Sequence, residues 1–134
     1  MATTLTPFLN YNKQCAEAFR FYHQLLGGEL TVQTYGDHPM KEQLPREMHD
    51  TVMRAHLVLD GAVLMGCDVR PGVTVRPEGF EVALGVSDPG EAERIYAALG
   101  EGGEVTMPLQ PAPGAQRFGM VTDRYGIPWM VSCE

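Results

Sequence analysis

The sequence has 134 residues, of which 44% are hydrophobic and 20% are charged, and this composition is typical of an ordinary globular domain. Its formal net charge of −7 argues against nucleic acid or an anionic membrane as a partner, because both require a basic surface. The sequence contains no run of about 18 apolar residues, so we expect no membrane-spanning helix.

The first seven residues lack the basic region and the apolar core of a secretory signal, so we expect no signal peptide. The three cysteines, Cys15, Cys67 and Cys133, are widely spaced and odd in number. They indicate reduced thiols and a cytoplasmic location rather than a disulfide framework.

The sequence contains two similar halves. When the first half is shifted by 74 positions, Glu17 falls on Glu91 and Tyr22 falls on Tyr96. The other matching pairs are Ala18 and Ala92, Phe21 and Ile95, and Leu25 and Leu99. Two such units can form one sheet around a shared cleft, so we expect a functional site on the inner face of that cleft.

The first half predicts a strand, a helix and three further strands. The helix is expected over about residues 13–26, because apolar residues recur at steps of three and four. Asn12 is expected to cap it, and Gly27-Gly28 to end it. The strands are expected over residues 6–12, 29–35, 52–59 and 62–67, with a long polar loop over residues 36–51 that acts as a lid or is mobile.

The hairpin of the first half also predicts which residues share a face. Asp60-Gly61 is a strong two-residue turn signal, and a turn there pairs Leu59 with Ala62. Counting back from the turn places His56 beside Met65 on one face. Both faces are largely apolar, so the sequence leaves open which face packs against the helices.

The second half repeats the pattern after a connection over residues 69–79. Strands are expected over residues 80–87, 104–109, 117–122 and 127–133, with a helix that ends near Leu99. Asp88, Pro89 and Glu91 predict a capping box at the start of this helix. A loop that matches the long one of the first half is expected at Pro111, Pro113 and Gly114, and Pro108 and Pro128 are expected at sheet edges or strand ends. Asp68 and Asp123, at strand ends or turns, are expected to bond the backbone.

Several segments together indicate a family. They are residues 7–11, 18–22, 56–61, 64–65 and Asp68 in the first half, and residues 102–103, 107–109, 118–119 and 123–129 in the second. With the double β-α-β-β-β pattern, the chain resembles the vicinal-oxygen-chelate superfamily, which includes glyoxalase I, extradiol dioxygenases, fosfomycin-resistance and bleomycin-binding proteins. It is most similar to the PhnB-like branch. The resemblance implies an α+β fold in which two modules, about residues 5–68 and 80–133, form a curved mixed sheet (a half-barrel) around a cleft in a single domain, and it implies a homodimer.

Metal-using members of this superfamily place ligands early in the first strand and in the last strand of each module. The corresponding positions here are Pro7, Met65, Glu81 and Met130, of which only Glu81 suits a hard metal. His56, beside Met65, would be a second ligand, whereas a catalytic zinc normally has three protein ligands. We therefore predict no cofactor; if a divalent metal binds, Glu81 and His56 are its expected ligands.

The resemblance implies a site for a small molecule whose identity is undefined. If the protein is an enzyme, we expect Glu81 as the general base and His56 as the acid or orienting group for proton transfer next to a carbonyl. Met65, Trp129 and Met130 are expected to line the ligand site, because soft side chains suit an apolar or aromatic ligand. The alternative is a non-catalytic protein that sequesters an apolar or cationic compound, as bleomycin-resistance proteins do. A structural or protein-interaction module is a third alternative.

Relatives in this branch carry names that refer to ubiquinone methylation and phosphonates. The sequence shows no glycine-rich loop after a strand that would hold S-adenosylmethionine. It also shows no cluster of Lys and Arg suited to a phosphonate dianion. We therefore expect neither activity from the residues themselves.

Overall fold

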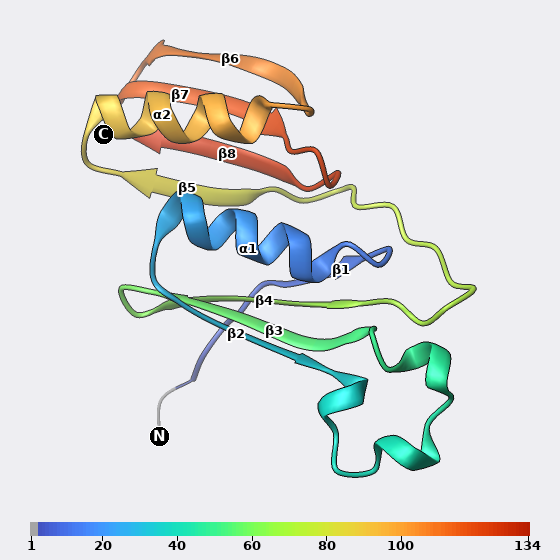
Figure 1. Ribbon diagram of the computed structural model, residues 1–134. Coiled ribbons are helices and arrows are strands. Elements are labelled where there is room, and N and C mark those ends of the chain that lie inside the picture. The colour runs from blue at the N-terminus through green and yellow to red at the C-terminus, as the bar shows by residue number, and fades with distance from the viewer. Residues whose placement is uncertain (1–2) are drawn as a thin grey trace. The chain divides into compact units, whose positions relative to one another are not determined.

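The computed structural model describes residues 3–134, and the chain divides into two compact units, Met1–Val75 and Arg76–Glu134. Each unit is a four-stranded sheet with one helix packed on it (Figure 1). The first unit contains β1 (Phe8–Tyr11), α1 (Cys15–Leu26), β2 (Glu29–Thr34), β3 (Val52–Leu59) and β4 (Ala62–Asp68). The second contains β5 (Val82–Val86), α2 (Pro89–Gly100), β6 (Glu104–Ala112), β7 (Ala115–Thr122) and β8 (Pro128–Cys133).

The two units have the same topology. The strand orders are β1-β4-β3-β2 and β5-β8-β7-β6. In each unit the first strand runs parallel to the last, and the other pairs are antiparallel. A shift of 74 positions carries both ends of α1 onto both ends of α2. The predicted α+β fold with two β-α-β-β-β modules is therefore confirmed. No helix among residues 3–134 is both long and apolar enough to cross a membrane.

Each helix covers one face of its own sheet. The structure thus shows which face of the β3–β4 hairpin packs against a helix, which the sequence left open. In the first unit Phe19 of α1 is fully buried and lies so close to Gly66 of β4 that a Cβ there would be 2.7 Å from the ring. The buried residues of the strands, such as Leu57 and Leu64, share this face. His56 and Met65 alternate with them and lie on the opposite face, which we call the open face of the sheet.

The hairpin between β3 and β4 has the predicted register. Leu59 pairs with Ala62, and His56 pairs with Met65. Asp60 and Gly61 have φ values of 40° and 85°, which is the left-handed backbone that this turn requires. The neighbourhood of His56 and Met65 is thus confirmed.

The prediction that Asn12 caps α1 is wrong. The N-cap residue is Gln14, whose side chain makes no capping bond, and Lys13 adopts a left-handed φ of 67° that separates Asn12 from the helix start. Asn12 instead makes two hydrogen bonds with the backbone of Val75, accepting from its N–H at 3.0 Å and donating to its carbonyl at 2.8 Å. It therefore fixes the end of the first unit rather than the start of its helix.

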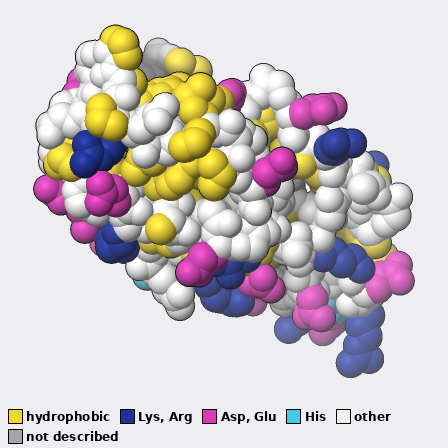
Figure 2. Space-filling model, turned by 90° about the horizontal axis from the view of Figure 1, so that it is seen from above, with side chains coloured by type: hydrophobic (Ala, Val, Ile, Leu, Met, Phe, Trp, Pro, Cys, Tyr) yellow, Lys and Arg dark blue, Asp and Glu magenta, His cyan; other side chains and the backbone are white. Residues whose placement is uncertain are grey.

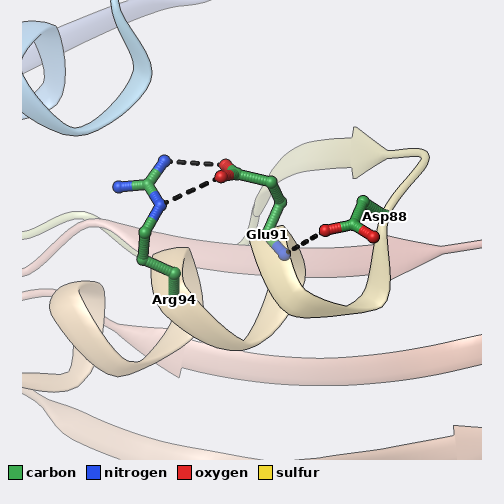
Figure 3. A network of polar contacts seen from close by, with 3 residues as sticks. All are labelled: Asp88, Glu91 and Arg94. Atoms are coloured by element: carbon green, nitrogen blue, oxygen red, sulfur yellow. Dashed lines mark hydrogen bonds and ion pairs between the residues drawn. The ribbon is translucent and has the colours of Figure 1, made fainter.

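The start of α2 agrees with the predicted cap in one of its two bonds (Figure 3). Asp88 Oδ2 accepts a 3.0 Å hydrogen bond from the backbone N–H of Glu91, and Pro89 occupies the first helical position. The carboxylate of Glu91 does not complete the box; it accepts two bonds from Arg94, at 2.7 and 3.2 Å. Asp88 alone therefore caps the helix.

The connections differ between the two halves. In the first, residues 35–48 contain three short 3-10 turns, and backbone bonds from Tyr35 to Thr51 and from Gly36 to His49 close the loop at its base. In the second, the prediction of a long loop at Pro111, Pro113 and Gly114 is wrong in length: β6 continues through Pro111 to Ala112, and only Pro113 and Gly114 form the turn to β7. Pro108 and Pro111 are accommodated because β6 is an edge strand, and Pro128 begins β8, as predicted for Pro108 and Pro128.

Candidate functional site

One row of paired residues crosses the open face of each sheet. Residues that pair directly across neighbouring strands share a face, so the register defines these rows. The first row is Phe8, Met65, His56 and Thr31, on β1, β4, β3 and β2. The second row is Ala83, Met130, Met120 and Met107, on β5, β8, β7 and β6. The second row presents only apolar and thioether groups, and the first combines Phe8 and Met65 with the polar His56 and Thr31. The apolar and thioether groups suit the surface of an apolar ligand.

His56 is the one titratable residue in these two rows. It lies between Met65 and Thr31, and its Nε2 atom is buried without a hydrogen-bond partner among residues 3–134. Buried polar side-chain atoms in folded proteins nearly always have a partner. The ring nitrogen is therefore an unsatisfied hydrogen-bonding group next to the apolar side chain of Met65.

Glu81 precedes β5 and lies in the second unit, where its side chain is exposed. It lines an open hollow of about 390 Å³ together with Glu78, Phe80 and Met120, the last of which belongs to the second row. His56 belongs to the other unit, so the pairing of these two residues as base and acid remains a prediction.

The two predicted ligand-binding residues of the second unit, Met130 and Trp129, have different surroundings. Met130 lies in the second row, on the open face. Trp129 faces the helix side, is only 1% exposed, and donates a 2.9 Å hydrogen bond from Nε1 to Oδ2 of Asp123. Its indole N–H is thus already satisfied, although Trp129 also contributes to the lining of the hollow. Trp129 belongs mainly to the core, and its role in ligand binding remains a prediction.

The two buried aspartates serve the backbone, as predicted. Asp68 accepts from the N–H groups of Cys15 and Val52, each at 2.9 Å. Asp123 accepts from the N–H groups of Tyr125 and Ile127 at 2.9 and 3.0 Å, in addition to the indole of Trp129. Neither carboxylate is available as a catalytic base, because both are committed to structural hydrogen bonds.

The thiols of Cys15 and Cys67 do not provide a nucleophile at neutral pH. Burial, followed by the nearby carboxylate of Asp68, raises the pKa of Cys15 far above its ordinary value. The same two causes, in the same order, raise the pKa of the half-buried Cys67, which donates to Oδ1 of Asn10 at 3.4 Å. Both side chains therefore remain protonated, and nucleophilic catalysis needs the thiolate.

The two cross-strand pairs that contain Met65 and Met130 do not fit a hard divalent metal. The register places Phe8 opposite Met65 and Ala83 opposite Met130, so Pro7 and Glu81 are not the cross-strand partners of the two methionines. The backbone carbonyl of Pro7 accepts from the N–H of Met65 instead. The side chains of Phe8, Met65, Ala83 and Met130 offer no oxygen or nitrogen ligand to zinc, nickel or manganese. The two ligands that the sequence predicts, Glu81 and His56, belong to different units. Residues 3–134 also contain no group of three or more His, Cys, Asp and Glu side chains placed to hold a metal ion.

A second, wider hollow of about 490 Å³ lies between α2 and β6. It is lined by Glu93, Tyr96, Val105, Pro108 and Leu109. Figure 2 views the molecule from the side on which β6 lies in Figure 1 and shows hydrophobic side chains gathered there, with charged groups around them. Glu93 accepts a bond from Arg117 at 3.1 Å, so its charge is partly balanced. This hollow contains none of the residues that the sequence predicted as catalytic or ligand-binding.

Comparison with known proteins places the chain in a family. The protein-family model of 3-demethylubiquinone-9 3-methyltransferase matches residues 3–132. Protein YjdN of Escherichia coli (strain K12) is 30% identical over 137 residues, which cover 96% of this chain and 93% of that protein.

Solved structures of similar proteins support the same assignment. Protein PA1353 from Pseudomonas aeruginosa is 42% identical with a TM-score of 0.91, covering 99% of this chain and 98% of that one. A putative 3-demethylubiquinone-9 3-methyltransferase, PhnB protein, from Bacillus cereus is 25% identical with a TM-score of 0.77, covering 98% and 100%. A glyoxylase/bleomycin resistance protein/dioxygenase domain from Frankia sp. EAN1pec, 19% identical with a TM-score of 0.64 over 99% and 98%, shares the fold. The chain therefore belongs to the 3-demethylubiquinone-9 3-methyltransferase family, is PhnB-like, and shares the fold of the glyoxylase/bleomycin resistance protein/dioxygenase domain.

Proposed function

We propose that this protein binds a small, largely apolar organic molecule on the open faces of its sheets. The observation that carries the proposal is the buried Nε2 atom of His56, which has no partner among residues 3–134. Leaving such an atom unsatisfied costs about 1–3 kcal/mol, so a ligand with one polar group gains from bonding to it. The rest of the ligand would cover Met65 and Phe8, the latter 46% exposed.

For conversion of the ligand, we propose Glu81 as the general base and His56 as the acid or orienting group. A carboxylate and an imidazole are suited to moving a proton next to a carbonyl group. The buried position of the His56 ring beside Met65 supports the role of His56, because a water-poor surrounding strengthens electrostatic interactions with a reacting group. Exchange of a ligand's C–H for deuterium in D₂O, followed by NMR, tests it: Glu81→Gln is expected to slow the exchange at least tenfold.

The alternative is binding without turnover. The mismatch between the two rows and a hard metal favours it over metal-dependent chemistry, because the thioethers of Met65 and Met130 stand where ligands would be needed. A ligand that binds to the wild-type protein but shows no deuterium exchange would support this alternative and contradict the catalytic proposal.

Labelling the methionine methyl groups with ¹³C offers a direct test of binding. The chain has eight methionines, which include Met65 and Met130 in the rows and Met40 and Met48 in the long loop. The protein would be titrated with three probes that each contain one benzene ring and differ in charge: benzyl alcohol, phenylacetate and benzyltrimethylammonium. We expect at least one of them to shift the methyl signals of the rows and to leave those of the loop unchanged. Shifts confined to the loop, or none at all, would contradict the proposal.

Substitution of His56 gives a second and independent readout. In His56→Leu the unsatisfied nitrogen is removed, so we expect the ligand-free protein to become more stable by about 1 kcal/mol while the probe binds more weakly. The matched control is His38→Leu, because Nδ1 of His38 accepts a 3.0 Å bond from the backbone N–H of Met40. That control is expected to lose stability slightly and to bind the probe as the wild type does.

A further inference from the structure

We infer that the hollow of the second unit binds a small organic cation with an apolar body, of the aromatic quaternary ammonium type. The hollow is formed by the segment before β5 together with the open faces of β6, β7 and the start of β8. The inference deepens the proposed function and rests on it for the premise that the open faces bind small molecules. It adds the chemical class of the ligand for this unit.

The size and walls of the hollow suit a small molecule. Its volume of about 390 Å³ lies in the range of small-molecule sites, roughly 300–1,000 Å³. Pro77, Phe80, Met120 and Pro128 supply apolar walls, and Phe80 is 38% exposed. An aromatic ring and a thioether both interact favourably with a cation that carries methyl groups.

The charges around the hollow select the sign of the ligand. Two carboxylates line it, Glu78 and Glu81, and its lining includes no Lys, Arg or His among residues 3–134. The ion pairs described in this unit use other glutamates: Arg94 pairs with Glu91, Arg117 with Glu93, and Arg124 with Glu101. None of these three ion pairs includes Glu78 or Glu81, so none of them balances the negative charge at the hollow.

The whole unit reinforces this sign. Residues 76–134 contain nine acidic residues and four arginines, with no lysine or histidine, which gives a formal net charge of −5. Such a field attracts cations and repels anions over several ångströms of water. A neutral apolar molecule would gain the burial but not the attraction, and an anion would be repelled.

The chain carries its own reporter for this site. Trp129 is the single tryptophan, and it contributes to the lining of the hollow. The full-length protein would be titrated with benzyltrimethylammonium, phenylacetate and benzyl alcohol, with Trp129 fluorescence and the ¹³C methyl signal of Met120 as readouts. We expect the cation to bind about tenfold or more tightly than phenylacetate, and its affinity to fall severalfold between about 0.05 and 0.5 M NaCl.

Charge variants identify the groups responsible. The double variant Glu78→Gln with Glu81→Gln is expected to weaken binding of the cation about three- to tenfold, since an exposed ion pair contributes modestly. Glu17→Gln removes one charge from the exposed side of α1 in the first unit and is the control, with unchanged affinity. Arg76→Ala removes the cation adjacent to the lining residue Pro77 and is expected to strengthen binding.

Two results would overturn the inference. In one, phenylacetate binds as tightly as benzyltrimethylammonium; in the other, the double variant binds the cation as the wild type does. Failure of the inference can be told from failure of the proposed function. A probe that shifts the methyl signal of Met65 but not that of Met120 contradicts the inference and leaves the proposed function intact. If no probe shifts the signal of either methionine, both are contradicted.

Discussion

The backbone N–H of Cys15 donates a 2.9 Å hydrogen bond to Oδ1 of Asp68, although the two residues are 53 positions apart. The other carboxylate oxygen accepts from the N–H of Val52, also at 2.9 Å. One side chain at the end of β4 thus fixes the first residue of α1 and the first residue of β3. It provides at a distance the acceptor that Gln14, the N-cap residue of α1, does not provide.

Replacing Asp68 with Asn should therefore destabilise the protein. The amide keeps the shape of the side chain but places an N–H₂ group against one of two backbone N–H donors, at a site that is only 7% exposed. We expect the free energy of unfolding, measured by urea denaturation, to fall by about 2–3 kcal/mol. The control is Asp60→Asn in the exposed β3–β4 turn, where a φ of 40° suits Asn, and it should change stability by less than about 0.5 kcal/mol. Equal effects of the two substitutions would contradict this account.

Much of the fold could be predicted because its signals are local. Asp60-Gly61 determines the turn type and, with it, the register that brings His56 and Met65 together. Asp88 and Pro89 define the start of α2 from side-chain and backbone chemistry within one turn. The spacing of 74 between the halves then transfers the helix of one half onto the other.

The cap of α1 and the equivalence of the first strands were predicted wrongly, because the connection from strand to helix differs by one residue between the two units. The chain needs Asn12, Lys13 and Gln14 to pass from β1 to α1, but only Ser87 and Asp88 to pass from β5 to α2. The helices therefore match at a shift of 74, whereas the open faces of the first strands match at 75, Phe8 with Ala83. A slip of one residue in a strand moves every side chain to the other face, so Pro7 and Glu81, which are 74 positions apart, do not occupy equivalent positions in the two modules.

The second row could not be predicted from the sequence. Met130 and Met120 pair regularly, but the pairing of Met107 with Met120 depends on bulges between β6 and β7. Bulges add a residue to one strand without a reliable sequence signal, so the strand predicted over residues 104–109 did not show which of its side chains lie on the open face. The orphan Nε2 of His56 is likewise a consequence of packing, which no local pattern encodes.

The N-caps of the two helices provide a matched pair of substitutions. Asp88 accepts a bond from the N–H of Glu91 (Figure 3), whereas Gln14, at the equivalent position 74 residues earlier, makes no side-chain bond. We expect Asp88→Ala to lower the free energy of unfolding by about 1 kcal/mol, because an N–H at the start of α2 loses its acceptor. Gln14→Ala should leave it within about 0.5 kcal/mol of the wild-type value. If Gln14→Ala proved as costly as Asp88→Ala, the assignment of the caps would be wrong.

Gly66 allows α1 to approach β4 closely. A Cβ at this position would lie 2.7 Å from Cε1 of Phe19 and 2.9 Å from the carbonyl oxygen of Leu9. Since a strand backbone cannot yield easily, we expect Gly66→Ala to destabilise the protein by about 1–3 kcal/mol in thermal or urea unfolding. In the background Phe19→Leu the same substitution should cost less, because one of the two clashes is removed.

The matched control for Gly66 is Gly85 in β5, where an added Cβ would have no neighbour closer than Oγ of Ser132 at 3.9 Å. Gly85→Ala should be neutral or stabilise by up to about 1 kcal/mol, because alanine restricts the unfolded chain more than glycine does. A loss of stability at Gly85 as large as that at Gly66 would show that the cost is a general property of these strands and not of the contact with Phe19.

The raised pKa of Cys15 predicts how stability depends on alkaline pH. Its ordinary value is 9.0, and in the folded protein burial, then Asp68, then Cys67 raise the pKa well above that. Above about pH 9 the unfolded chain loses this proton while the folded protein keeps it, so the unfolded state binds fewer protons and stability falls as pH rises. For one fully shifted thiol the limiting slope is about 1.4 kcal/mol per pH unit. Urea unfolding between about pH 8 and pH 10 should show this decline, and it should be shallower in Cys15→Ala. Cys67→Ala removes a thiol that is only half-buried and should flatten the slope less; identical slopes in the wild type and Cys15→Ala would refute the assignment to Cys15.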